Sequence, residues 1–387
     1  SGGVFVALRT GQLESIVQVQ RLSDTGSAVW SNPVLASPTS GDGYRLRILA
    51  DGSGGVIVAW WRQGLIEDRG IFVQRIDASG NRLWGDDAVR VTDFDGTPEI
   101  CEDSAGGVFV TWADRRVLPH LDVYVQHVTA AGSVSWVADG LLVCGAESTQ
   151  TNPKIVADGA GGAIVAWRDY GQSPIGIYAQ HVDVTGTMGW QACGNPALGN
   201  ALLDEDFELA ADGSGGAVIA ASYGALGEQN IRAQRIDGSG QRLWLSQGVP
   251  VSTAAGGQVD PQLAVGADGS AYLAWRDHRN GCGDIYAQKL ATNGSPAWTL
   301  DGVMVAVFNE DQIEPTIAAG GPEEIYAFWR DQRGDQDRLF LLPIGASGSG
   351  VSEECTFRTD VPDAERSRLS LENYPNPFNP RTEFSFT

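Results

Sequence analysis

Apolar residues along this chain occur in short runs, and Gly, Asp and Ser separate one run from the next. Val56–Trp60 and Ile177–Gln180 are typical runs, rich in the β-branched and aromatic residues that strands favour. No segment shows a sustained apolar period of about 3.6 residues, which marks an amphipathic helix. The pattern therefore predicts an all-β protein with very low helix content.

The apolar runs repeat at a nearly constant spacing, which identifies a repeat architecture. One kind of run follows a Gly-rich turn, and its last residue recurs at steps of 52–55 residues: Leu8, Trp60, Trp112, Trp167, Ala221, Trp275 and Trp329. The next run of each unit contains a Gln that is followed by a Trp ten residues later, in the pairs Gln20/Trp30, Gln74/Trp84, Gln126/Trp136, Gln180/Trp190, Gln234/Trp244 and Gln288/Trp298. Seven units are visible, the first entered midway and the last cut short after Phe340.

Each unit contains four short runs that read as strands. One of them opens with Pro, as Pro153–Ala157 does, and Pro is tolerated at the first residue of a strand. Four antiparallel strands that recur about every 50 residues are typical of a β-propeller, whose blades stack radially. We therefore predict a β-propeller of seven visible four-stranded blades over residues 1–343, with the first and last blades incomplete.

Composition narrows the class of protein without naming a ligand. The chain has 50 Gly, 42% hydrophobic residues and a formal net charge of −22. The apolar content excludes a disordered acidic tail, and the lack of a three-residue Gly period excludes collagen. No apolar run reaches the roughly 18 residues of a membrane helix, so we expect no membrane span. Nucleic acid is excluded as a partner because it requires clustered Lys and Arg.

Three stretches carry a resemblance to known repeats. Asp51–Trp60 and Asp284–Gln288 fit the pattern D-G-x-G-G-x-x-V-x-W…D-I-Y-A-Q, which resembles a family of uncharacterised, repeat-rich surface propellers and implies no known activity. The turn Asp77–Trp84 is similar to the tryptophan-docking element of quinoprotein-type propellers and to the Asp-box of sialidases. Its spacing differs from both, so no cofactor residue carries over, and we expect neither a cofactor nor a bound metal.

The C-terminal end changes in character after the repeats. Residues 344–370 are rich in Gly and Ser and then in charged residues, which is typical of a linker. In residues 371–387 the string Y-P-N-P-F-N-P-R-T strongly resembles the first strand of the Ig-like sorting tails of type IX secretion substrates, related to flagellar hook-cap Ig-like domains. Only that opening strand is present. The resemblance implies the secretion machinery as a partner and an extracellular or outer-membrane location; the alternative is a Pro-rich spacer, which Pro keeps extended.

Variable loops at one end of the blades are the predicted binding surface, because binding sites favour loops on a rigid scaffold. Asp and Arg residues recur there, and the planar donor fork of Arg can bind an anionic sugar or peptide. The candidate ligand-binding residues are Asp114, Arg116, Asp169, Asp277, Arg279, Asp331 and Arg333. The alternative is that each Arg pairs with an Asp of its own loop. The short Asp-Gly turns at the opposite end are interpreted as tight hairpins rather than calcium ligands, and the repeated Gln as a structural amide.

The five cysteines match no zinc signature, and their odd number requires at least one free thiol or an intermolecular bond. We interpret them as incidental. No serine-hydrolase elbow, zinc-protease motif or phosphate loop is present, so we assign no catalytic residue and predict that the chain is not an enzyme.

The predicted function is a secreted or surface-displayed, non-catalytic binding or adhesion module with a glycan or a surface protein as partner. Two alternatives remain: a hydrolase or lyase that acts on an extracellular polysaccharide through the same Asp residues, and a passive spacer.

Overall fold

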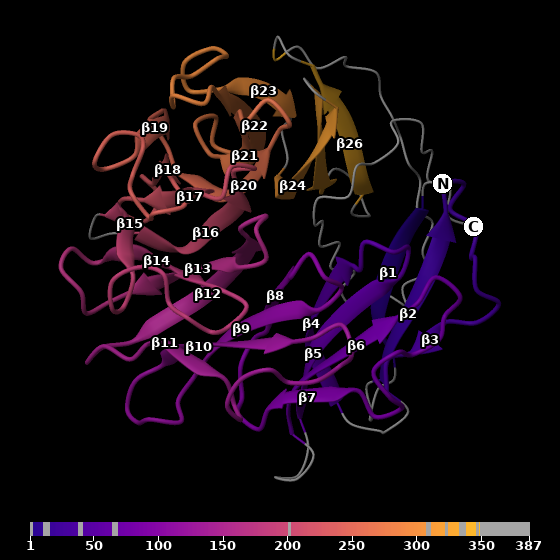
Figure 1. Ribbon diagram of the computed structural model, residues 1–387. Helices are drawn as coiled ribbons and strands as arrows, with labels where there is room; N and C mark the ends of the chain where they lie inside the picture. The colour runs from indigo at the N-terminus through magenta and orange to yellow at the C-terminus, as the bar shows by residue number, and fades with distance from the viewer. Residues whose placement is uncertain are drawn as a thin grey trace. The chain divides into compact units, whose positions relative to one another are not determined.

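The computed structural model describes residues 3–10, 16–37, 42–63, 69–199, 203–306, 311–321, 324–332, 338–345 and 348. These residues form 26 strands, and they include no helix, hence no helix long and apolar enough to cross a membrane. The strands make seven antiparallel sheets, which are the blades of an all-β propeller fold (Figure 1). The prediction of seven blades is confirmed. The predicted linker and tail, residues 344–370 and 371–387, lie almost entirely outside the described residues.

The chain divides into two units, and residues 1–173 and 178–195 belong to the first. Its sheets follow the order of the sequence, with each strand paired to the next along the chain. Blade 1 has three strands: β1 (Gly3–Thr10), β2 (Ile16–Ser23) and β3 (Val34–Leu35). Blades 2 and 3 have four each: β4 (Asp42–Ala50), β5 (Val56–Gln63), β6 (Gly70–Ile76) and β7 (Val89–Thr92), then β8 (Glu99–Glu102), β9 (Val108–Asp114), β10 (Asp122–Val128) and β11 (Leu141–Cys144).

Blade 4 is a four-stranded sheet of β12 (Gln150–Ala157), β13 (Ala163–Asp169), β14 (Gly176–Val182) and β15 (Asn195–Gly199). The second unit holds most of the remaining chain. Its first two sheets are β16 (Leu203–Ala211), β17 (Ala217–Tyr223), β18 (Asn230–Ile236) and β19 (Val249–Ser252), then β20 (Gln258–Val265), β21 (Ala271–Asp277), β22 (Asp284–Leu290) and β23 (Val303–Ala306). The last sheet has three strands, β24 (Gln312–Gly321), β25 (Glu324–Asp331) and β26 (Arg338–Ile344).

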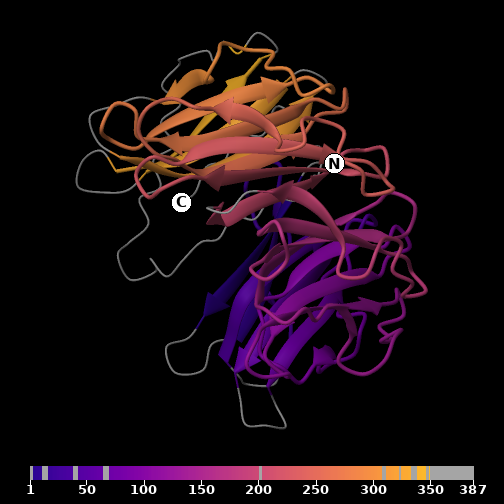
Figure 2. The same cartoon turned by 90° about the vertical axis from the view of Figure 1, so that its left-hand side faces the viewer.

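The hydrophobic core of each unit lies between neighbouring sheets. One cluster joins blade 2 to blade 3, with Ile57 and Val73 packed with Val110 and Trp112. The strands within a unit run side by side as twisted sheets, as the turned view shows (Figure 2). Because both faces of a blade are covered, the strands read as continuous apolar runs rather than as an alternation of apolar and polar residues.

The repeated Gln explains the constant ten-residue spacing to the following Trp. In blade 2 the Gln74 Oε1 accepts hydrogen bonds from the backbone N–H groups of Arg75 and Trp84, each at 3.0 Å, and its Nε2 donates to the Gly85 carbonyl at 2.7 Å. The same pattern recurs at Gln126, Gln180, Gln234 and Gln288. Each amide therefore satisfies three backbone groups, and the structural interpretation of the Gln repeat is confirmed.

Replacing one of these amides should destabilise the unit that contains it. Gln126 is fully buried, so Gln126→Met leaves two N–H groups and one carbonyl without their partner. We expect a loss of about 2–4 kcal/mol in the free energy of unfolding, since each unpaired buried group costs on the order of 1 kcal/mol or more. Urea unfolding measures the loss, and the exposed Gln241→Met serves as control. Equal midpoints for the two variants would contradict this role.

The Trp that follows each Gln joins one blade to the next. The indole Nε1 of Trp30 donates to the carbonyl of Ala78 at 3.1 Å, and that of Trp84 to the carbonyl of Ala130 at 3.0 Å. Trp136 and Trp244 repeat the contact with Val184 and Thr292. Within each unit, the indole therefore fixes one blade to the outer hairpin of the following one.

The Asp-Gly turns are closed by their own carboxylates, which confirms the hairpin interpretation. In the blade 3 turn the Asp103 Oδ1 accepts from the N–H groups of Ala105 and Gly107, both at 2.7 Å, and its Oδ2 lies 2.8 Å from the His127 Nε2. Asp51, Asp158 and Asp212 make equivalent turns and pair with Arg75, His181 and Arg235.

These turns predict destabilisation by acid. Burial alone would raise the pKa of Asp103, but the hydrogen bonds from His127 and from the turn N–H groups outweigh it and lower the pKa below its usual 3.8. The pKa of Asp51 and of Asp158 is lowered in the same way. A carboxylate whose pKa is lower in the folded state than in the unfolded state stabilises the fold at pH values above its unfolded pKa. This stabilisation is lost as the pH falls through the folded-state pKa.

We therefore expect the free energy of unfolding to hold steady down to about pH 5 and to fall below about pH 4. Urea unfolding at a series of pH values measures this fall. Asp103→Asn should flatten it. A free energy of unfolding that stays constant from about pH 5 down to about pH 2 would contradict the stabilising role of these carboxylates.

Candidate functional site

Blade 2 breaks the repeat at the end of β5. In blades 3, 4, 6 and 7 an Asp stands two residues after the first Trp of the repeat, whereas blade 2 has Trp60, a second aromatic residue at Trp61, and Arg62 in place of the Asp. Blades 1 and 5 also lack the Asp, with Thr10 and Tyr223 at this position, but only blade 2 has a cation there. A position that departs from the repeat in this way is where a function is expected. This end of β5 is also the end that carries the variable loops.

The break is occupied by a group of aromatic and arginine side chains, Arg9, Tyr44, Arg45 and Trp61, which we call the blade-2 cluster. Tyr44 of β4 lies opposite Trp61 of β5, with ring centroids 5.7 Å apart and ring planes inclined by 40°. The Arg9 Cζ of β1 lies 4.0 Å from the centroid of the Tyr44 ring. The Arg45 Cζ lies 5.5 Å from the centroid of the Trp61 ring. Two guanidinium groups thus flank one aromatic pair.

A bulge in β4 brings Arg45 to this position. The pairing of β4 with β5 shifts register between Tyr44 and Arg47, and Arg45 has a φ of 55°. A left-handed backbone is unfavourable for a residue with a side chain, and such strain is found at functional sites. Asn152, Asp260 and Glu314 have the same left-handed backbone on β12, β20 and β24, so the bulge itself belongs to the scaffold and only its side chains are special to blade 2.

The charges around the cluster are unequally paired. Arg47 binds Glu99 of β8 through two hydrogen bonds, Nε to Oε2 at 2.8 Å and NH2 to Oε1 at 2.6 Å. Arg45 has only a loose, exposed ion pair with Asp95 at 3.6 Å. Among the residues that the structure describes, no carboxylate lies within ion-pairing distance of the exposed Arg9. Two guanidinium groups therefore remain able to bind an anion, in a chain that is otherwise strongly acidic.

Two buried polar groups lie at the same end of β5. The Trp61 Nε1 is buried and has no hydrogen-bond acceptor among the described residues. Arg62 is 3% exposed, donates from NH2 to the Ser37 Oγ at 3.0 Å and places its Cζ 4.0 Å from the centroid of the Phe72 ring. Blade 2 therefore has a buried cation, Arg62, at the position where blades 3, 4, 6 and 7 have an Asp.

Asp114 and Arg116, which were predicted to bind a ligand, pair within their own loop instead. Asp114 is 2% exposed, and its carboxylate accepts from the Trp112 Nε1 at 2.8 Å and from the Arg116 guanidinium at 2.6–3.1 Å. Arg116 also donates to the Asp139 carbonyl and lies 3.6 Å from the Tyr124 ring centroid. This is the alternative of a self-paired loop.

The second unit repeats this arrangement. Asp277 is fully buried, accepts from the Trp275 Nε1 at 2.8 Å, and pairs with Arg279 at 2.7 Å. Arg279 also donates to the Asp301 carbonyl at 2.8 Å, as Arg116 does to Asp139. The motif is thus a scaffold element in both units.

Two of the three remaining predicted residues, Asp169 and Asp331, are enclosed by the scaffold as well. Asp169 is fully buried and accepts from the N–H groups of Gly171 and Gln172 at 2.9 and 2.8 Å. Asp331 is 1% exposed at the end of β25, and Arg333 lies outside the described residues. A carboxylate enclosed in this way is a poor candidate for ligand binding or acid–base chemistry, so neither of these two carboxylates belongs to the candidate site.

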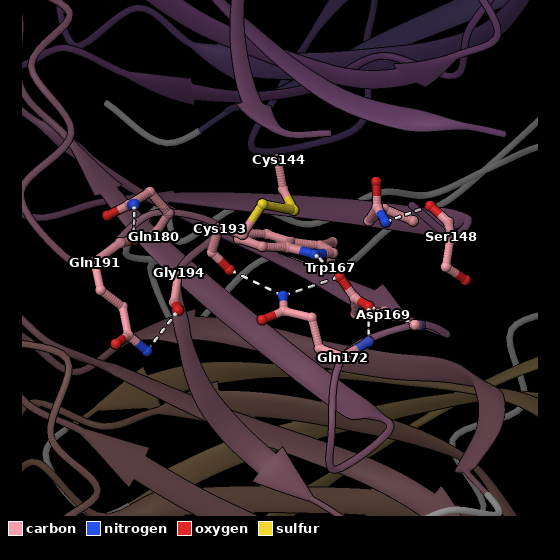
Figure 3. The surroundings of a disulfide bond; sticks show 11 residues. Cys144, Ser148, Trp167, Asp169, Gln172, Gln180, Gln191, Cys193 and Gly194 are labelled. Atoms are coloured by element: carbon pink, nitrogen blue, oxygen red, sulfur yellow. Dashed lines mark hydrogen bonds between the residues drawn. A yellow bond between two sulfur atoms is a disulfide. The ribbon is translucent and has the colours of Figure 1, made fainter. Parts of the chain in front are cut away.

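A disulfide that the sequence did not indicate joins blades 3 and 4. Cys144 at the end of β11 is bonded to Cys193 before β15, 49 residues further along the chain (Figure 3). The Cys193 carbonyl accepts a hydrogen bond from the Gln172 Nε2 at 3.1 Å, which also donates to Asp169. The sequence did contain a sign of this bond. The two cysteines are 49 residues apart, which is close to one repeat and places them in adjacent blades. Disulfides are favoured in oxidising compartments.

Comparison with known proteins gives the fold and no close relative. No protein-family model matches the chain, and no curated protein matches it. Among solved structures, an ulvan lyase of a polysaccharide lyase family, bound to -[GlcA(1-4)Rha3S]-, matches with a TM-score of 0.53 and 10% identity over 82% of this chain and 85% of that one. The polysaccharide lyase Uly1 matches with 0.55 and 12% over 90% and 88%. The lectin BP39L from Burkholderia pseudomallei matches with 0.54 and 10% over 90% and 97%.

These neighbours share the fold, and they correct two predictions. The predicted non-catalytic binding or adhesion function is contradicted, and so is the prediction that the chain is not an enzyme, because two of the three structures are polysaccharide lyases. The alternative of a polysaccharide hydrolase or lyase agrees better with them. At these identities the likeness establishes the fold alone.

Proposed function

We propose that this protein is an extracellular enzyme that cleaves a polysaccharide, as a lyase or a hydrolase, and that the blade-2 cluster holds the sugar chain. The observation that carries the proposal is the break in the repeat at Trp61 and Arg62, where aromatic and arginine side chains replace the scaffold Asp. The polysaccharide lyases that share the fold support it.

The cluster has the chemistry that an acidic sugar requires. The Tyr44 and Trp61 rings offer apolar surface for the C–H face of a sugar ring. Arg9 and Arg45 offer planar donor forks that match a carboxylate or a sulfate. The Tyr44 hydroxyl is an O–H group at the cluster and is suited to proton transfer to a leaving oxygen. The expected substrate is therefore a polysaccharide with acidic groups.

Two assays on one set of polysaccharides test the proposal and separate its two forms. A lyase that acts on a uronate leaves an unsaturated sugar, which absorbs ultraviolet light, whereas a hydrolase releases reducing ends without it. We expect products from an acidic polysaccharide and none from neutral dextran. A protein that leaves every acidic polysaccharide tested at its original length would overturn the proposal.

We also propose that the chain is exported through the type IX secretion machinery by the tail in residues 371–387, which lie outside the described residues. Support comes from the string Tyr374–Thr382 and from the Cys144–Cys193 disulfide, which suits an oxidising compartment. Removal of residues 371–387 from the full-length protein should leave it inside the producing cell. An unchanged amount in the medium or on the cell surface would contradict this assignment.

A further inference from the structure

A chain of hydrogen bonds connects Ser135, His127 and Asp103 in blade 3, away from the blade-2 cluster and at the opposite end of the strands. The Ser135 Oγ lies 2.8 Å from the His127 Nδ1, and the His127 Nε2 lies 2.8 Å from the Asp103 Oδ2. Ser135 is exposed, whereas the side chains of His127 and Asp103 are each 4% exposed. An exposed hydroxyl is thus backed by a buried imidazole and a buried carboxylate.

The partners decide which imidazole nitrogen carries the proton. Asp103 is an acceptor, because its lowered pKa keeps the carboxylate ionised and its other oxygen already accepts two turn N–H groups. In the neutral imidazole, the His127 Nε2 therefore donates to Asp103, and the Nδ1 lone pair faces the Ser135 hydroxyl. This is the electronic arrangement of a serine activated by a general base, with the two ring nitrogens exchanging the roles they have in the common triad.

Comparison with blade 4 shows that the scaffold does not require the serine. His181 and Asp158 form the same pair at 2.8 Å, and Gly189 occupies the position of Ser135. Blades 2 and 5 have Leu83 and Leu243 at this position, with Arg75 and Arg235 in place of the histidine. The pair between a basic residue and an Asp is therefore structural, and blade 3 alone among these four blades adds a nucleophile to it.

Rings hold the imidazole in place. The Phe109 ring centroid lies 4.7 Å from that of His127, and the Trp136 centroid lies 5.9 Å from it. Trp136 is itself fixed by its indole hydrogen bond to the Val184 carbonyl. A base held by packing and by a carboxylate keeps its lone pair directed at the hydroxyl, which general-base activation needs.

We propose that Ser135 is a second reactive site, a nucleophile towards esters of small carboxylic acids. The Ser135 Oγ attacks the ester carbonyl carbon and passes its proton to the His127 Nδ1, while Asp103 stabilises the imidazolium. The bond from the carbonyl carbon to the alcohol oxygen then breaks, and Nδ1 returns the proton to that oxygen. Water then gives a proton to Nδ1 and attacks the acyl carbon, the bond from that carbon to the Ser135 Oγ breaks, and Nδ1 returns the proton to Oγ, so that ester and water give acid and alcohol.

The local backbone sets the expected rate. The N–H of Ser135 donates to the His127 carbonyl at 2.8 Å, and the N–H of Trp136 donates to the Gln126 Oε1 at 3.2 Å, so neither is available to an oxyanion. Loss of one oxyanion donor lowers a rate by about 100-fold to 1,000-fold. We therefore expect Ser135 to react slowly, and only with activated esters and phosphonates, whose good leaving groups offset the missing oxyanion donors.

A fluorophosphonate probe followed by peptide mapping tests the site in the whole protein, with p-nitrophenyl acetate as a second reagent. We expect one label per chain, on Ser135, and its complete loss in Ser135→Ala. Ser133→Ala, which removes another exposed hydroxyl of the same turn, should label as the wild type does. His127→Gln should slow labelling at least 100-fold while circular dichroism remains native.

The outcomes separate the proposal from its alternatives. Label on Ser133 or on several surface serines, or labelling of Ser135 at the same rate with and without His127, would overturn it. The absence of label on folded wild-type protein would overturn it as well. Because the blade-2 cluster takes no part in these reactions, failure of the polysaccharide assay leaves this result unaffected.

Discussion

Loss of the Cys144–Cys193 disulfide should lower the free energy of unfolding of the first unit by about 4 kcal/mol. This is the free energy of the chain entropy that the unfolded chain regains when a loop of this length is no longer closed. The bond closes 49 residues and ties blade 3 to blade 4. Its surroundings are buried, because Cys144 is 1% exposed and packs in the cluster that contains Ile155 and Trp167. A loss of this size approaches the whole stability of many domains.

Urea unfolding of the wild type with and without dithiothreitol measures this effect, and the Cys144→Ala/Cys193→Ala double variant is the control. The variant should unfold at the lower midpoint and should not respond to the reductant. In the folded protein Cys101 should not exchange with the bond, because burial raises the pKa of its thiol and keeps it protonated. Equal midpoints for reduced and oxidised wild type would contradict a structural role for the bond.

Changes in the blade-2 cluster should have the largest effect on activity. Arg9→Ala removes a guanidinium that has no carboxylate partner among the described residues, and a charge-assisted hydrogen bond to substrate contributes about 1.5–3 kcal/mol. The corresponding fall in kcat/KM is roughly 10-fold to 150-fold. Trp61→Ala removes half of the aromatic pair and should reduce kcat/KM at least as much.

Kinetics on the acidic polysaccharide that gives products measures both losses. Arg232→Ala is the matched control, because the Arg232 Cζ lies 4.1 Å from the Tyr223 ring centroid and so forms a similar stack in blade 5. That variant should keep wild-type kcat/KM. Equal losses in Arg9→Ala and Arg232→Ala would show that the effect comes from stability, which would count against the cluster as the site.

The scaffold was predictable from the sequence because its contacts are local and repeat. Gln74 and Trp84 bond to each other within one blade, side chain to backbone, so their spacing is visible in every unit. The Asp114–Arg116 pair was predictable too, since both residues lie in one loop. The repeat also contained the sign of the candidate site, because Arg62 stands where blades 3, 4, 6 and 7 have Asp.

The other groupings depend on contacts between separate strands. Arg9 of blade 1 contacts Tyr44 of blade 2, and a bulge brings Arg45 over Trp61. Nothing in the residue types around Arg45 indicates that bulge. Ser135 and Asp103 are 32 positions apart in the numbering and meet only through His127. Distances between side chains on different strands require the folded register, which a single sequence does not specify.

The most direct test of the central claim is the length of an acidic polysaccharide after incubation with the wild type and with Trp61→Ala, followed by size-exclusion chromatography. The account predicts that the wild type shortens the polymer and that the folded variant leaves it nearly intact. Shortening by both proteins at the same rate would contradict the assignment of the site to blade 2, and shortening by neither would contradict the proposed activity.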